Sequence, residues 1–254
     1  MRLDKDRIAQ CFLRSLQSYD AAARVQNKLA GRLMQSLQGV PDAAFASVLE
    51  IGCCTGTLTE KLCSERPVQK LYCNDLVPEF EDVLQGRFAG KSSVQFIPCF
   101  GDIEALPFPC EFSLVLSGAT FQWLSDPHSF LKRLGRELAP GSYLAFSLFG
   151  PGTLQEFSSL TGVQLEYVPD EALTETLDAD FEILHYETFQ DTLFFSTVRE
   201  ILGHIRDTGV GGVSEYKWNK QSLQEFETGY EETFGTDKGL PVSYASSCFV
   251  ARRR

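Results

Sequence analysis

The sequence lacks several features that would place it in a common class of protein. None of its apolar runs reaches about 18 residues, so we expect no membrane-spanning helix. The first residues, Met1 to Arg7, lack the apolar core of a signal peptide, and we therefore expect a cytoplasmic protein. The pattern G-x-x-x-x-G-K-[ST] does not occur, which argues against a phosphate-binding loop of that type.

Patterns that hold metals or disulfides are also missing. The chain has eight cysteines, none of them in a C-x-x-C pair, and three histidines. This spacing predicts neither a zinc site nor a disulfide framework, and we expect no bound metal. Most of the cysteines lie in apolar, strand-like runs, where a free cysteine is typically a small buried hydrophobic residue.

Positive charge is scarce over most of the chain. The net charge of −11 argues against non-specific binding of nucleic acid. Residues 1–39, however, carry seven lysines and arginines against three aspartates, a net charge of +4 on an otherwise acidic chain. These basic residues are either the solvated faces of helices or a docking strip for an acidic partner. Within such a strip, Arg24, Lys28 and Arg32 are the candidates for docking.

The pattern that is present is that of an α/β domain. The 254 residues are 43% hydrophobic and 22% charged, as in soluble globular proteins. Apolar residues at helical spacing predict two helices, over 8–19 and 25–37, before the first strand. Strands and helices then alternate, with strands expected over 48–51, 68–75, 94–99, 112–117 and 143–148 and helices over 56–65, 79–88 and 127–138. This alternation predicts a parallel sheet with helices on both faces.

The pattern changes after Gly150. Here we expect a helix over 171–177, a strand over 182–189, helices over 196–207 and 221–234, and a last strand over 243–251. The expected fold is α/β and Rossmann-like: a seven-stranded, mostly parallel sheet with helices on both faces, an N-terminal helical lid and a helical insertion before the last strand. We place the lid at residues 1–40 and the main domain at residues 41–254, with the insertion at about 191–240.

The most informative stretch runs from Val48 to Gly56. An apolar strand ends there in a glycine-bearing turn, and a helix follows, an arrangement that presents free backbone N–H groups to a ligand. The strand carries an acid, Glu50, just before the turn. A carboxylate at that point repels a diphosphate but can accept hydrogen bonds from an ammonium group. This favours S-adenosylmethionine (SAM) over a dinucleotide.

Two further acids follow the next strands. Asp75 comes 25 residues after Glu50, at the end of the second strand, where an acid can bind the hydroxyls of a ribose. Asp102 follows the third strand and could accept a hydrogen bond from an adenine amino group, whereas Glu104 is expected to cap the turn after it. Together these acids describe an adenosyl ligand without phosphates. The residues expected to bind SAM are Glu50, Gly52, Cys53, Cys54, Gly56, Asp75, Leu76, Asp102, Ile103 and Ser117.

These residues resemble the motifs of class I SAM-dependent methyltransferases. The stretch from Glu50 to Gly56 is similar to the family's E/D-x-G-x-G-x-G motif, Asp75 matches its ribose acid, and residues 101–108 resemble its adenine loop. The resemblance covers about residues 46–150. It departs from the motif at Cys54, which replaces the middle glycine and adds a Cβ that restricts φ. This departure bears on the affinity for the cofactor more than on the fold.

A narrower resemblance, to the malonyl-[acyl-carrier-protein] O-methyltransferases of biotin synthesis, covers nearly the whole chain. The segments that carry it are residues 8–12, 18–20, 117–123, 146–154, 195–209 and 240–244. The resemblance implies methyl transfer from SAM to the free carboxylate of a malonyl group on acyl carrier protein, at the start of the pimeloyl chain. It also implies an acidic partner, which favours the docking interpretation of the basic strip.

The implied reaction needs no base, because a carboxylate is already ionised at neutral pH. It does need a cation that selects malonyl over acetyl, and Arg199 and Arg206 are the candidates. Tyr19 could contact SAM or the substrate, and Gln122 and Trp123 could shape the substrate pocket.

Two other functions stay open from the sequence. One is a methyltransferase that acts on another small acid or on a quinone. The other is a methyltransferase-like binding protein that has lost SAM, which Cys54 suggests.

Overall fold

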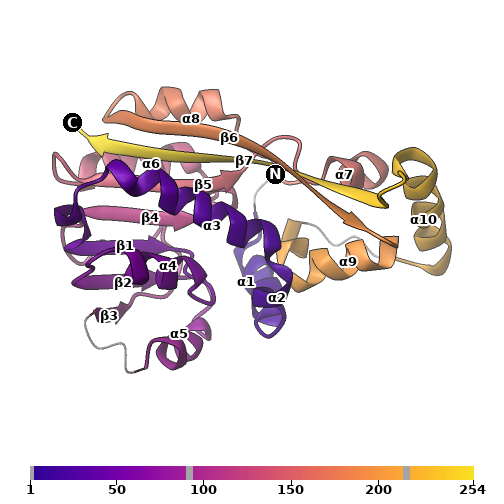
Figure 1. Ribbon diagram of the computed structural model, residues 1–254, viewed down its shortest axis with the longest axis horizontal. Helices are drawn as coiled ribbons and strands as arrows, with labels where there is room; N and C mark the ends of the chain where they lie inside the picture. Colours follow the sequence, from indigo (N-terminus) through magenta and orange to yellow (C-terminus); the bar gives the residue numbers. More distant parts are fainter. Residues whose placement is uncertain (1–2, 90–93, 214–217) are drawn as a thin grey trace.

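The computed structural model describes residues 3–89, 94–213 and 218–254 (Figure 1). Its sheet has seven strands in the order β3-β2-β1-β4-β5-β7-β6. They are β1 (Ser47–Ile51), β2 (Lys70–Asn74), β3 (Gln95–Pro98), β4 (Leu114–Gly118), β5 (Tyr143–Phe149), β6 (Phe181–Phe195) and β7 (Leu240–Arg253). The first five strands are parallel, and β7 runs antiparallel to both of its neighbours. The expected mostly parallel, seven-stranded α/β fold is confirmed.

Helices cover both faces of the sheet, as expected. One face packs against α3 (Arg24–Ser36) and α4 (Thr57–Glu65), and the other packs against α6 (Pro127–Glu137) and α8 (Asp170–Leu177). Consecutive residues of β1 show why: Val48 belongs to the first core cluster and Leu49 to the second. Both side chains are buried because side chains alternate across a strand, so a doubly covered strand must be apolar on both faces.

The described residues form six further helices and four 3-10 turns. They are α1 (Lys5–Ser15), α2 (Tyr19–Ala22), α5 (Phe80–Phe88), α7 (Gln155–Thr161), α9 (Val198–Asp207) and α10 (Lys220–Phe234), with the 3-10 turns η1 (Leu37–Gly39), η2 (Asp42–Phe45), η3 (Phe121–Trp123) and η4 (Val210–Val213). The sequence did not predict α7, because this short segment is rich in serine and threonine, which are weak helix formers.

The antiparallel part of the sheet is longer than the sequence indicated. β6 continues to Phe195, and β6 and β7 together project beyond the parallel strands towards α7, α9 and α10 (Figure 1). The helices α9 and α10 lie between these two strands in the chain, as predicted for a helical insertion before the last strand. Thr197 starts α9 by accepting a hydrogen bond from the Glu200 N–H, and Asn219 starts α10 in a capping box with Ser222.

Three helices, rather than the expected two, precede β1. The additional helix arises because the first expected helix ends before Ser18, whose hydroxyl donates to the carbonyl oxygens of Ser15 and Asp207 and does not cap α2. Both α1 and α2 contact α9, whereas α3 packs on the sheet through fully buried residues such as Leu33 (Figure 1). The division into a lid of residues 1–40 and a main domain stays a prediction. Within the described ranges, no helix has both the length and the apolar character needed to cross a membrane.

Candidate active site

The turn after β1 is fixed by glycine geometry and by the end of β2. Gly52 has φ +72°, and a Cβ at this position would lie 2.0 Å from the Thr120 Oγ1. The N–H groups of Gly52 and Cys53 both donate to the Asn74 carbonyl oxygen, at 2.8 and 2.9 Å. Gly56, with φ +88°, then leads into α4. The first glycine of the motif is therefore required by the close approach of Thr120.

Cys54 holds a left-handed conformation, with φ +48°, although it is not a glycine. The turn thus keeps the geometry of the usual glycine motif at the cost of some backbone strain, about 1–2 kcal/mol for an ordinary side chain. The Cys54 thiol hydrogen-bonds the Tyr19 hydroxyl of α2. Burial, reinforced by the Asp75 carboxylate, raises the pKa of the thiol well above its usual range, so the thiol stays neutral.

Asp75 is a buried carboxylate held by backbone N–H groups. Its Oδ2 accepts from the Cys54 N–H at 2.8 Å, and its Oδ1 accepts from the Val77 N–H at 3.0 Å. Burial raises the pKa of Asp75 to about 6, and the backbone N–H groups of Val77, Cys54 and Leu76 oppose this rise. A carboxylate has about four acceptor positions. Asp75 can therefore still accept from a ligand donor, such as a ribose hydroxyl.

A cavity of about 680 Å³ opens beside this turn. The carboxyl ends of β1, β2 and β4 and the loop after β3 form one wall, and α1 and α2 form the other. The lining residues are Lys5, Ile8, Phe12, Tyr19, Ile51, Gly52, Cys54, Asn74, Asp75, Leu76, Val77, Gly101, Asp102, Ile103, Gly118, Ala119, Thr120, Trp123 and Leu124. The structure thus brings six of the predicted SAM-binding residues together with Tyr19 and Trp123.

A second hollow of about 400 Å³ adjoins this cavity and shares part of its wall, namely Tyr19, Gly52, Cys54, Gly118 and Ala119. It also touches Glu50, Cys53 and a residue that the sequence did not single out, Gln26 of α3. Glu50 is 1% exposed and accepts a hydrogen bond from the Thr59 hydroxyl at 2.6 Å. Burial is the main cause that raises the pKa of Glu50 to about 8.

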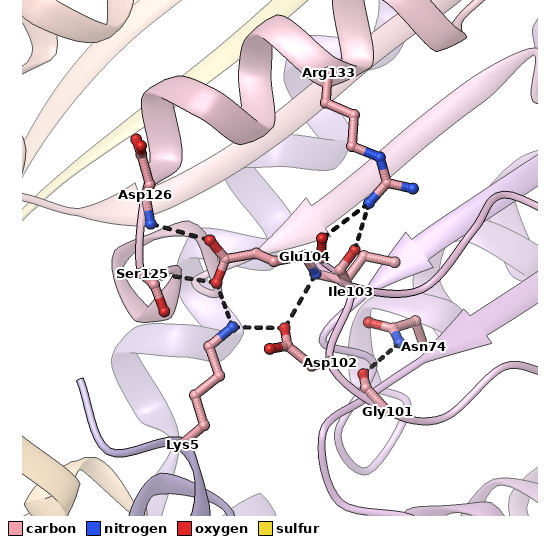
Figure 2. A network of polar contacts seen from close by, with 9 residues as sticks. All are labelled: Lys5, Asn74, Gly101, Asp102, Ile103, Glu104, Ser125, Asp126 and Arg133. Carbon is pink, nitrogen blue, oxygen red and sulfur yellow. Dashed lines mark hydrogen bonds and ion pairs between the residues drawn. The ribbon is translucent and has the colours of Figure 1, made fainter. Parts of the chain in front are cut away.

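The N-terminal helices are tied to this region at two points, of which Figure 2 shows the first. The Lys5 ammonium group pairs with Asp102, at 2.5 Å, and with Glu104. Glu104 also accepts from the N–H groups of Ser125 and Asp126, at 2.8 and 3.0 Å. The prediction that Glu104 caps the turn after it is therefore wrong, since the carboxylate reaches the loop before α6 and the start of α1.

The second tie involves Asp20 of α2. Its carboxylate accepts from the Thr55 hydroxyl at 2.5 Å and pairs with Arg87 of α5 at 2.6 Å. Arg87 in turn donates to the Thr55 carbonyl oxygen at 2.7 Å. The turn after β1 is therefore held between α2 and α5.

Two side chains that the sequence did not single out hold the loop that carries Asp102. Arg133 of α6 donates to the carbonyl oxygens of Ile103, at 2.9 Å, and Leu106, at 2.6 Å. Asn74 donates to the Cys99 carbonyl oxygen at 2.8 Å and to the Gly101 carbonyl oxygen at 3.0 Å, and Figure 2 shows the second of these contacts. The signal for Asn74 was its position beside Asp75 at the end of a strand, whereas nothing in the sequence pointed to Arg133.

Three of the predicted site residues brace the structure around the cavity. The Ser117 hydroxyl donates to the Ile51 carbonyl oxygen at 2.9 Å and ties β4 to β1. The Gln122 amide donates to the Ala119 carbonyl oxygen at 2.7 Å and accepts from the Phe149 N–H at 3.4 Å. Gly56 lets α4 pass close to α5, because a Cβ there would lie 2.5 Å from Leu84.

The predicted substrate arginines lie on α9, away from the cavity lining. The Arg199 side chain is 77% exposed and pairs with Glu227 at 3.0 Å, and the Arg206 side chain is 76% exposed and pairs with Asp207 at 2.8 Å. Among the described residues that line the larger cavity, Lys5 has the only cationic side chain.

The predicted docking residues lie on α3, and two of them have an acidic partner. Lys28 and Arg32 both pair with Asp191 of β6, and the Arg32 guanidinium also lies over the Phe189 ring, 3.9 Å from its centre. The Arg24 guanidinium lies 5.6 Å from the centre of the Phe195 ring. Arg2, also counted in the basic strip, lies outside the described residues.

Comparisons with known proteins agree with this architecture. A family model described as a methyltransferase domain matches residues 49–146. Among solved structures, N-methyltransferase NodS from Bradyrhizobium japonicum, in complex with S-adenosyl-L-homocysteine, aligns over 97% of this chain and 98% of its own with a TM-score of 0.56 and 16% identity. The YcgJ protein from Bacillus subtilis aligns over 87% of this chain and 99% of its own, with a TM-score of 0.60 and 15% identity. Identities this low show the shared fold alone.

The fold and the family model together define a methyltransferase of the SAM-dependent class. Curated relatives narrow the assignment. A malonyl-[acyl-carrier protein] O-methyltransferase from Chlorobium phaeovibrioides is 35% identical over 99% of this chain and 97% of its own length, and one from Haemophilus influenzae is 32% identical over 98% and 95%. The chain belongs to the malonyl-[acyl-carrier protein] O-methyltransferase family.

Proposed function

We propose that this protein transfers a methyl group from SAM to the free carboxylate of a malonyl group carried by acyl carrier protein. The observation that carries the proposal is the extent of the match to the curated relatives, which covers 99% of this chain. The match therefore includes the N-terminal helices and the inserted helices as well as the methyltransferase domain. A role at the start of biotin synthesis and a cytoplasmic location are parts of this proposal.

The residues around the cavity fit SAM. Asp75 has acceptor positions for the ribose hydroxyls, Asp102 can accept from the adenine amino group, and Glu50 lies beside the smaller hollow, where a methionine ammonium group would enter. The two hollows share a wall, so one elongated ligand can occupy both. When bound, SAM supplies an electrophilic methyl group on its sulfonium.

The reaction requires little of the protein beyond positioning the carboxylate against the methyl group and removing water. The malonyl carboxylate is ionised at neutral pH, so one of its oxygens can form the new O–CH₃ bond without a proton transfer. The S–CH₃ bond breaks and its electron pair stays on sulfur, which leaves S-adenosylhomocysteine and a methyl ester. The aromatic side chains of Phe12, Tyr19 and Trp123 line the cavity and would desolvate the carboxylate.

Recognition of the malonyl carboxylate is proposed for Arg199 or Arg206, with Tyr19 contacting the substrate or SAM. Each arginine would have to leave its acidic partner to do so. Replacing Arg199 or Arg206 by glutamine should raise the KM for malonyl-carrier protein about tenfold or more, as expected for the loss of a charged hydrogen bond. If neither change alters KM, neither arginine recognises the substrate.

Docking of the acidic carrier is proposed for Arg24, Lys28 and Arg32. Arg24 and Lys28 are exposed on α3, whereas Arg32 is partly buried between Asp191 and Phe189. Reversing Arg24 and Lys28 to glutamate should raise the KM for the carrier-bound substrate and leave SAM binding nearly unchanged, because the change opposes an acidic surface away from the cavity. An unchanged KM contradicts this docking proposal.

The proposed reaction is tested by incubating the full chain with methyl-labelled SAM and malonyl-carrier protein. Acetyl-carrier protein, which lacks the free carboxylate, is the matched control. We expect base-labile label on malonyl-carrier protein and none on the control. Malonyl-coenzyme A, an aconitate and a demethylquinone in parallel reactions test the other acceptors, and transfer to one of these with none to malonyl-carrier protein would overturn the proposal.

A further inference from the structure

The smaller hollow is lined by a side chain that has a buried polar atom without a partner. Among the described residues, five side chains have such an atom: Gln26, Ser147, Asp170, His185 and Ser246. Only Gln26 among these five lines either of the two hollows. The unpartnered atom is its Oε1, a hydrogen-bond acceptor. Buried acceptors are normally satisfied, so an unpartnered acceptor on a side chain that lines a hollow indicates a missing donor.

We propose that the Gln26 side chain accepts a hydrogen bond from the ammonium group of the methionine part of SAM. This inference rests on the proposed function and adds a residue to its cofactor site. It makes α3, which follows α1 and α2 in the chain, part of the binding site for the amino-acid end of the cofactor.

Two of the residues that line the hollow, Glu50 and Gln26, carry acceptors suited to an ammonium group. The Thr59 hydroxyl already donates to the Glu50 carboxylate. An ammonium group has three donors and no acceptor, so several acceptors around it are the matching environment. Burial keeps the pKa of Glu50 high in the ligand-free chain, whereas an amide oxygen accepts at any pH.

The position of Gln26 is fixed by its neighbours on α3. Val25 and Leu29 are 3% and 1% exposed and belong to the core cluster beneath the helix. A side chain on such a packed helix can be placed with the precision that a ligand contact needs. Tyr19 and Cys54 line the same hollow, which places Gln26 near the turn after β1.

The test compares two ligands that differ only at the amino-acid end. S-adenosylhomocysteine carries the ammonium group, and 5′-methylthioadenosine lacks the whole amino-acid part. Gln26→Leu, which removes the acceptor at similar volume, should raise the Kd of S-adenosylhomocysteine about tenfold to a hundredfold, the range for a hydrogen bond to a charged group. The Kd of methylthioadenosine should change less than about twofold, because this ligand makes no contact at that end.

Two further variants sharpen the result. Gln35→Leu, an exposed glutamine on the same helix, should bind both ligands as the parent does. Gln26→Glu keeps the acceptor and adds negative charge, so it should bind S-adenosylhomocysteine at least as tightly as the parent. Weaker binding by Gln26→Glu would show that the amide donates to the ligand carboxylate instead, and would overturn the proposal.

The remaining outcomes are also decisive. Unchanged binding of S-adenosylhomocysteine by Gln26→Leu overturns the proposal, and so does an equal loss of both ligands, which would indicate a general role in the fold. Failure of the parent itself to bind either ligand would contradict the proposed function, and is distinct from any result that concerns Gln26 alone.

Discussion

The two ends of the cavity differ in which part of the chain builds them. At the adenosine end, Asp75 and Asp102 lie on loops that follow strands of the sheet, and backbone N–H groups hold both carboxylates. At the methionine end, the sheet supplies Glu50, but α2 and α3 supply Tyr19 and Gln26. The acids of the first end are therefore placed by the sheet and its loops, whereas the second end takes part of its polar groups from the N-terminal helices.

The largest effect is expected at the adenosine end. Asp75→Asn removes the charge that would bind the ribose hydroxyls, so the Kd values of S-adenosylhomocysteine and methylthioadenosine should both rise about a hundredfold or more. Calorimetric titration of both ligands measures this, and Asp82→Asn, an exposed change on α5, is the control. Parent-like binding of both ligands by Asp75→Asn would remove Asp75 from the site.

The pH dependence of binding should distinguish the two ends. The pKa of Glu50 is about 8 in the ligand-free chain, and an ammonium group beside it stabilises the carboxylate and lowers that pKa. Binding then releases a proton, so S-adenosylhomocysteine should bind more tightly, by about tenfold, as the pH rises from the pKa of Asp75, about 6, towards that of Glu50, about 8.

Methylthioadenosine is the internal control for this prediction, since it lacks the ammonium group and should show little change over the same range. Glu50→Gln should remove the dependence for S-adenosylhomocysteine. The same slope for both ligands, or a slope that survives in Glu50→Gln, would assign the titration to Asp75, because burial raises the pKa of the nearby Cys53 and Cys73 thiols above their usual value and out of this pH range.

A smaller effect is expected from the tie between α1 and the sheet. Lys5→Met removes a partly buried cation that pairs with Asp102 and Glu104, worth about 1 kcal/mol, or about fivefold in affinity for both ligands. Limited proteolysis should also cut α1 sooner in this variant. Lys70→Met, an exposed change on β2, is the control. Unchanged affinity and unchanged cleavage would show that this contact does not hold the helix.

The smallest effect is expected at Cys54. Cys54→Gly relieves a left-handed backbone conformation, so S-adenosylhomocysteine should bind at least as tightly as to the parent, with a gain of up to about threefold. The same calorimetry measures it. Markedly weaker binding would show that the turn depends on the contact between the thiol and Tyr19.

The two ends also differ in how well the sequence predicted them. Asp75 and Asp102 were found because strands and helices alternate regularly, and parallel strands bring their carboxyl ends to one edge of the sheet. Lys5 and Gln26 were missed because their roles depend on how the N-terminal helices dock, which no local pattern specifies. The same regular alternation predicted the strands and the long helices. The short α7 and the full length of β6 depend instead on tertiary packing.

The central claim is that this cavity binds SAM through both ends. Titration of the full chain with S-adenosylhomocysteine by calorimetry tests it most directly. We expect saturable binding of one ligand per chain at micromolar concentration, tighter than that of methylthioadenosine. No binding at millimolar concentration would contradict the account and favour a methyltransferase-like protein that has lost its cofactor.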